Sequence, residues 1–135
     1  MNRIDIYLTK GGEYKLTFVE KEMVNTAVLT GPVPNPSIYL MTKGARVDGL
    51  RGDFQEYKKL NPSDYKAKAT MIKNNLIKYL DSFPNMPKDF VQFERQELIN
   101  YSLLYLIQYE YLHGQVTGQL ATFRVSDDFL KELKE

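Results

Sequence analysis

The sequence predicts an α+β fold in which strands occupy the first third of the chain and helices the rest. Apolar and polar residues alternate on both sides of Gly11 and Gly12, whereas beyond residue 53 the apolar spacing lengthens to that of helices. Strands in one block followed by helices in another favour α+β over an alternating α/β fold. The 135 residues fit one domain. We therefore expect a single domain, 1–135, mainly β over 1–43 and mainly α over 53–135.

The N-terminal residues predict an antiparallel β hairpin that extends into a meander. Residues 3–8 and 14–19 each place apolar side chains on alternate positions. Gly11 and Gly12 between them are typical of a tight hairpin turn. The segments VNTAVL (24–29) and SIYLM (37–41) are two further strand candidates.

Prolines and glycines mark the connection from strands to helices. Pro32, Pro34 and Pro36 fix the backbone and remove hydrogen-bond donors, so they predict a stiff, extended arm rather than a central strand. The segment TKGARVDGLRGD (42–53) contains three glycines and predicts a flexible connector, which would be the hinge of the domain.

The second half predicts two long antiparallel helices. Asp53, followed three residues later by Glu56, indicates a capping box for a short helix over 54–60. Asn61 and Pro62 predict the N-terminus of a long helix that runs to about residue 82. After the break FPNMP (83–87), a second long helix should end at Gly114, a natural left-handed C-cap.

The C-terminal residues predict a return to the sheet and a final helix. Ala121, Phe123 and Val125 alternate, which indicates a possible late strand. Ser126 is a typical N-cap for a short C-terminal helix, with acidic residues in its first turn and lysines near its end.

The stretch NYSLLYLIQYEYLHG (100–114) is apolar on almost every side of the expected helix and yet carries Tyr101, Tyr105, Tyr109 and Tyr111. A tyrosine ring packs while its hydroxyl takes a polar partner, which is typical of core boundaries and of interfaces. Two interpretations are open. The tyrosines form a rim that contacts another protein, or the helix is central and its hydroxyls reach backbone or solvent.

Motifs for catalysis, metals or cofactors are absent from the sequence. There is no cysteine, and His113 is the only histidine, expected in the last turn of a helix near free carbonyl groups. Glu94 and Glu97 lie one turn apart on an expected exposed face, with no second pair to complete a metal site. The sequence therefore predicts a protein that is not an enzyme and has no cofactor.

One weaker pattern indicates an anion site. Lys43, Arg46 and Arg51 lie in the glycine-containing connector, and glycine with basic residues can hold a phosphate group. The spacing matches neither the P-loop nor the dinucleotide fingerprint. An enzyme that acts on a phosphorylated substrate through residues 43–53 is thus a third functional alternative.

Charge and hydropathy limit the expected partners. The net charge of +1 gives no bulk attraction to nucleic acid or to an anionic membrane. No apolar run is long enough to span a bilayer, and the N-terminus has no signal-peptide pattern. We expect a protein partner, a second copy or another protein, and no secretion by a classical signal.

In its composition, small, free of cysteine and rich in Tyr, Lys and Asn, the chain resembles many small phage-encoded proteins. This resemblance implies a subunit of a viral assembly, structural or adaptor, in the host cytoplasm or in a virion, with the proline arm and the tyrosine helix as contact surfaces. A small inhibitor that binds and blocks one host enzyme is the second alternative.

Overall fold

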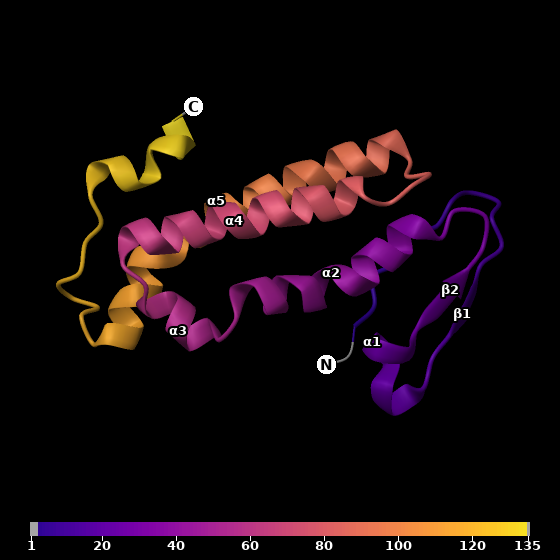
Figure 1. The fold of residues 1–135 in the computed structure, drawn as a ribbon, viewed down its shortest axis with the longest axis horizontal. Coiled ribbons are helices and arrows are strands. Elements are labelled where there is room, and N and C mark those ends of the chain that lie inside the picture. The colour runs from indigo at the N-terminus through magenta and orange to yellow at the C-terminus, as the bar shows by residue number, and fades with distance from the viewer. Residues whose placement is uncertain (1–2, 135) are drawn as a thin grey trace.

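The computed structural model describes residues 3–134. Figure 1 shows two long helices side by side along the length of the molecule, a third helix beneath them, and a small β lobe at one end. The elements in chain order are β1 (Lys15–Thr17), η1 (Glu20–Glu22), α1 (Met23–Thr26), β2 (Val28–Thr30), α2 (Asn35–Arg51), α3 (Phe54–Lys59), α4 (Pro62–Asp81), α5 (Lys88–Thr117) and η2 (Asp127–Lys134). The fold is α+β, but helix dominates it.

Helices α3 and α4 begin where the sequence predicts. The Asp53 side chain accepts a hydrogen bond from the backbone N–H of Glu56 (2.9 Å), and Asn61 accepts one from Asp64 (2.9 Å). Pro62 occupies the first position of α4, where a missing N–H costs nothing. These two starts are confirmed because each depends on residues within one turn of the helix.

Helix α2 overturns two predictions. The segment 37–41 is helical rather than a strand, and the glycine-containing connector 42–53 is helical as far as Arg51. Only Gly52, at φ 71°, ends the helix as a turn glycine. The Tyr39 side chain is fully buried and meets Phe83 and Phe90 edge-on, at 5.8 and 6.2 Å between ring centres. This packing outweighs the loss of helix stability, about 1 kcal/mol each, that Gly44 and Gly49 cause inside α2.

The β sheet contains two strands of three residues each. β1 pairs antiparallel with β2, with Leu16 opposite Leu29. The hairpin predicted between residues 3–8 and 14–19 is wrong, because 3–9 form no strand. The expectation of a mainly β region over 1–43 is wrong for the same reason and because α2 begins at Asn35.

The N-terminal segment is extended but docks onto helices instead. The Tyr7 backbone N–H donates to the Ser37 Oγ (2.8 Å), and that hydroxyl donates to the Tyr7 carbonyl (3.2 Å). The Tyr7 ring meets Phe90 of α5 edge-on at 5.3 Å. Tyr7 therefore attaches this segment to α2 and α5, whereas Ile6 and Leu8, which carry the apolar alternation, are exposed.

Helix α5 continues past its predicted end. Gly114 is buried within the helix, and the left-handed C-cap is Gly118, at φ 71°. A Cβ atom at Gly114 would lie 2.9 Å from the Leu120 Cα, so glycine there lets the following segment fold back onto the helix. The close approach of these two segments, and not the end of the helix, explains why position 114 is a glycine.

The C-terminal segment contains no strand between residues 118 and 126, so the late-strand prediction is wrong. A turn at 119–122 leads into an extended stretch in which the Val125 N–H donates to a Glu110 carboxylate oxygen (3.0 Å). The short C-terminal helix is confirmed, as the 3-10 helix η2, and its Phe129 side chain is buried.

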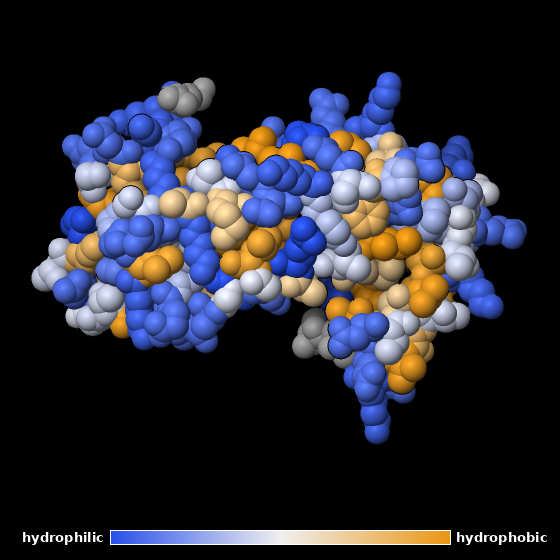
Figure 2. All heavy atoms as spheres, in the orientation of Figure 1, coloured by the Kyte–Doolittle hydropathy of each residue, from blue (hydrophilic) through white to orange (hydrophobic). Residues whose placement is uncertain are grey.

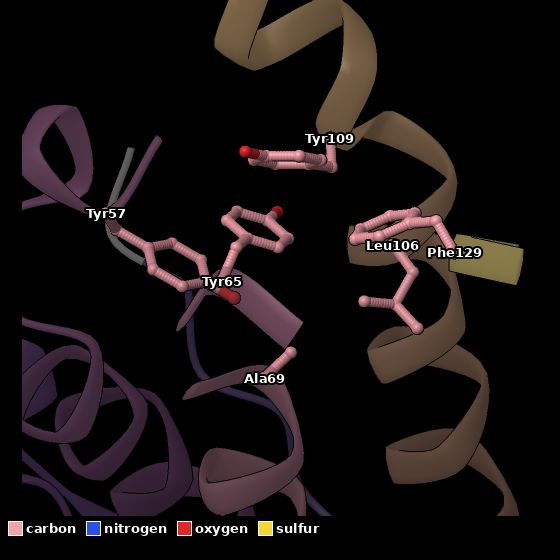
Figure 3. Packing of buried hydrophobic residues seen from close by; sticks show 6 residues of the cluster. All are labelled: Tyr57, Tyr65, Ala69, Leu106, Tyr109 and Phe129. Carbon is pink, nitrogen blue, oxygen red and sulfur yellow. The ribbon is translucent and has the colours of Figure 1, made fainter. Parts of the chain in front are cut away.

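The buried side chains form two clusters along α4 and α5. The first, shown in Figure 3, joins α3, α4, α5 and η2 and contains Tyr57, Tyr65, Ala69, Leu106, Tyr109 and Phe129. The second joins α2, α4 and α5 and contains Tyr39, Leu76, Leu80, Phe90 and Leu98. Tyrosine supplies four of the largest fully buried side chains, so this core is unusually rich in phenol groups.

Burial changes the acid–base behaviour of these phenols. Burial raises the pKa of Tyr57 and of Tyr109 to about 12. Burial, helped by the Glu94 carboxylate, raises the pKa of Tyr39 well above its ordinary value, and burial does the same for Tyr65.

We expect the protein to lose stability steeply above about pH 10. The unfolded chain releases phenol protons near pH 10 while the folded protein retains them, so the free energy of unfolding falls as pH rises from 10 to 12. Each such phenol lowers the free energy of unfolding by about 1.4 kcal/mol per pH unit in that window. Urea unfolding at several alkaline pH values measures the slope. Tyr65→Phe should reduce it and the exposed Tyr111→Phe should not; an equal slope in both variants would contradict this explanation.

Candidate interaction surfaces

The outward face of α5 exposes four large apolar side chains, three of them spaced three and four residues apart and the fourth eleven residues earlier in the helix. Phe93, Leu104, Ile107 and Tyr111 lie on the side of the helix opposite its buried residues, and between 44% and 65% of each residue's surface is exposed. No charged residue occurs between positions 98 and 109. We call these four residues the outer face of α5. In Figure 2, apolar side chains lie along the edge of the molecule where α4 and α5 run.

The four tyrosines of α5 divide between core and surface. Tyr109 is fully buried and its hydroxyl donates to the Leu60 carbonyl (2.6 Å), while Tyr105 is half-buried at the edge of the first cluster. Tyr101 and Tyr111 are exposed. Tyr101, Tyr105 and Tyr109 are each four residues apart, and four residues turn the helix about 40° beyond a full circle. Successive tyrosines therefore rotate from the surface at Tyr101 into the core at Tyr109. Tyr109 therefore fits the interpretation of a central helix, whereas for the exposed Tyr101 and Tyr111 contact with another protein stays a prediction.

A second apolar surface lies on the β lobe, which we define as residues 6–30. Six large apolar residues of the lobe are exposed: Ile6, Leu8, Phe18, Val19, Val24 and Val28. Figure 2 shows apolar side chains gathered over the region of β1, β2 and α1. Two short strands with so few buried side chains are marginal as an independent unit.

The predicted proline arm is shorter than expected. Pro32 is exposed and Pro34 half-buried beside the lobe, but Pro36 is buried in the first turn of α2. Pro36 is therefore a structural residue and not available for contact. Pro32 and Pro34 form only a short connection between β2 and α2.

The basic residues predicted to bind an anion lie on α2 and are each engaged by the protein. Lys43 forms an ion pair with Glu94, and the Arg46 guanidinium lies 4.3 Å from the centre of the Tyr79 ring. Arg51 pairs with Asp48 at 2.7 Å. The structure does not gather the three into a loop that could surround a phosphate, because the segment is helical.

Glu94 is buried, which corrects the expectation of an exposed face. Its Oε1 accepts a hydrogen bond from the Tyr39 hydroxyl (2.9 Å) and forms the ion pair with Lys43. The Glu94 side chain is 4% exposed and the Lys43 side chain 24%. A carboxylate at this depth needs both partners to offset its lost hydration. The sequence gives one local signal, since Glu94 falls four residues from both Phe90 and Leu98 on the buried face.

His113 lies inside the core rather than at an open helix end. Its Nδ1 is 2.8 Å from the Lys58 carbonyl oxygen of α3, and the centres of the His113 and Phe123 rings are 4.3 Å apart. Within residues 3–134, no group of three or more His, Asp or Glu side chains is placed to hold a metal ion. In that same part of the chain, no helix has the length and apolarity needed to cross a bilayer.

Comparison with known proteins gives no further lead: no family model, no curated protein and no solved structure matches this chain.

Proposed function

We propose that the protein is a non-enzymatic subunit of a protein assembly and that it contacts other copies of itself through the β lobe and the outer face of α5. The observation that carries this proposal is the distribution of exposed apolar residues. Of the fourteen exposed large apolar residues within 3–134, six lie in the lobe and five on α5, where Tyr101 adjoins the outer face. Apolar residues gathered in patches mark association sites, whereas single ones are normal.

The electrostatics of both surfaces favour a second copy as the partner. The lobe carries three lysines and three glutamates, and the middle of α5 carries no charge. Two copies with a net charge of +1 each repel one another only weakly. Contact between these surfaces therefore buries no uncompensated like charges.

The size of the surfaces sets the strength of association. A fully covered aromatic side chain buries roughly 150–250 Å², and the aliphatic ones bury less, so the eleven half-exposed residues offer on the order of 1,000 Å² over both surfaces, or roughly 500 Å² on each. A standard interface uses about 800 Å² per partner. Each contact is therefore weak alone, and two contacts per subunit stabilise an assembly that grows with concentration. A structural or adaptor protein of a phage particle, as the composition suggests, would act in this way.

Charged substitutions test the two surfaces. Ile107→Lys on α5 and Val28→Lys in the lobe should each lower the weight-average mass at high protein concentration, because lysine cannot be desolvated there without a partner. Gln92→Lys, an exposed polar position on α5, is the control that adds the same charge. Analytical ultracentrifugation measures the masses. If neither variant changes the mass of a self-associating wild type, the contact surfaces lie elsewhere.

Mixing the two variants identifies which surfaces meet. If the lobe of one copy contacts α5 of the next, the mixture retains one intact contact and should form a pair that cannot grow. If each surface pairs with its own kind, every variant alone should stop at a dimer.

A further inference from the structure

The C-terminal segment is anchored to the helices by one buried side chain. We call residues 119–134 the C-terminal strap, which is the yellow segment that loops out beyond the end of the helices in Figure 1. Within the strap Phe129 alone is buried, and the apolar residues Phe123, Val125 and Leu130 are half-buried. A segment with so few buried apolar contacts opens at a lower free energy than the domain as a whole.

The pocket that holds Phe129 is formed by α4 and α5. The centre of the Phe129 ring lies 5.1 Å from that of Tyr109, and Tyr65 belongs to the same cluster (Figure 3). Lys66 of α4 donates a hydrogen bond to the Phe129 carbonyl (2.8 Å) and forms an ion pair with Glu132 (2.7 Å). Each of these contacts joins the strap to the helices, so the strap of a second copy would make the same ones.

A sharp turn after α5 returns the strap to its own helices. Gly118 ends α5 in the left-handed conformation, at φ 71°, and the Gln119 N–H donates to the Gly114 carbonyl (2.8 Å). A Cβ atom at position 114 would lie 2.9 Å from the Leu120 Cα and 3.3 Å from the Gln119 carbonyl oxygen. Both are backbone atoms, so the turn requires glycine at position 114, whereas the pocket does not.

We propose that the C-terminal strap exchanges between copies, so that Phe129 of one subunit occupies the pocket beside Tyr109 of another. Exchange of an identical element retains the contacts of the closed form and is a low-cost route to association. Ten residues separate Gly118 from Phe129, and when extended they span roughly 33 Å, about three helix diameters. The strap is therefore long enough to reach the pocket of a neighbouring copy.

The local density of copies decides whether the strap exchanges. In an isolated chain the strap meets its own pocket at an effective concentration in the millimolar range. Exchange in the wild type therefore needs copies held at a similar density, and it rests on the proposed self-association to supply that density. The strap and its pocket share no residue with the β lobe or with the outer face of α5.

Carbodiimide cross-linking of isotopically mixed protein tests the exchange. The reagent couples Lys66 to Glu132, whose side chains are in contact and 24% and 35% exposed. Equal amounts of ¹⁵N-labelled and unlabelled chain are incubated at a concentration at which the mass exceeds that of one chain, then cross-linked and digested. Exchange predicts Lys66–Glu132 peptide pairs in which one peptide is labelled and the other is not. Phe129→Ala removes the anchor and should abolish these mixed pairs.

The variant Gly114→Ala tests the exchange without the assembly. The added Cβ blocks the turn and leaves the pocket intact, so the strap should dock in a second copy. At a concentration at which the wild type is a single chain, this variant should form a dimer with mixed Lys66–Glu132 pairs. Gln115→Ala, at the next and exposed position of α5, is the matched control and should stay a single chain.

The outcomes separate the exchange from the proposed assembly. A wild-type mass that rises with concentration while every Lys66–Glu132 pair stays within one chain overturns the exchange and leaves the assembly standing. A Gly114→Ala variant that stays a single chain, with unmixed pairs or none, also overturns the exchange. A wild-type mass that does not rise contradicts the assembly instead, and mixed pairs in Gly114→Ala would still show that the strap docks in a second copy.

Discussion

Replacing Tyr109 by alanine is expected to lower the free energy of unfolding by about 3–5 kcal/mol, the range for large aromatic side chains removed from a core. The centre of the Tyr109 ring lies 4.3 Å from that of Tyr65 and 5.1 Å from that of Phe129. Tyr109 therefore packs η2 against the helices. Its loss leaves a cavity where α3, α4, α5 and η2 meet (Figure 3). Tyr109→Phe should cost about 1–3 kcal/mol, because the Leu60 carbonyl loses its donor.

The matched control is Tyr111→Ala, two residues along the same helix. Tyr111 is 59% exposed and belongs to the outer face of α5, so its removal should change monomer stability by less than about 0.5 kcal/mol. Urea unfolding at low protein concentration measures both variants. Equal destabilisation by Tyr109→Ala and Tyr111→Ala would contradict the division of the tyrosines between core and surface.

Replacing Lys43 by methionine is expected to destabilise the protein by about 3–5 kcal/mol, because it leaves the buried Glu94 carboxylate without its cation. The Tyr39 hydroxyl alone cannot offset the lost hydration of the charge. An ion pair between a partly exposed lysine and a solvated carboxylate contributes little to folding stability. The burial of Glu94 therefore decides how much stability Lys43→Met removes.

A double-mutant cycle checks the explanation. Adding Glu94→Gln to Lys43→Met removes the unpaired charge and retains an acceptor for the Tyr39 hydroxyl, so it should restore most of the lost stability. The exposed ion pair of Arg95 and Asp81 offers a comparison, and Arg95→Met should cost less than about 1 kcal/mol. Additive effects of Lys43→Met and Glu94→Gln would show that the two side chains do not depend on one another.

The helices of the second half could be predicted because their signals are local. Asn61 and Pro62 form the start of α4 within one turn, and Asp53 does the same for α3. The length of α5 could not be read in the same way. Gly114 carries the expected C-cap residue type, but its position is set by the approach of Leu120, which a sequence does not display.

The first half could not be predicted because its structure is decided by packing between distant segments. A short apolar run such as SIYLM fits a strand or a buried helix equally well, and the burial of Tyr39 against α5 decides for helix. Alternation identified Lys15–Thr17 as extended but could not select Val28–Thr30 as its partner. The sequence indicates the tyrosine helix as a candidate surface but not the apolar β lobe, because the alternation there predicts residues covered within a larger sheet.

The most direct test of the proposed assembly is static light scattering of the wild-type chain over a wide concentration range. Self-association through two surfaces predicts a mass that rises with concentration beyond that of a dimer. In Ile107→Lys the mass should fall, to the 15.7 kDa of one chain if the lobe contacts α5 and to that of a dimer if each surface pairs with its own kind. A mass that stays at 15.7 kDa at every concentration would contradict self-association.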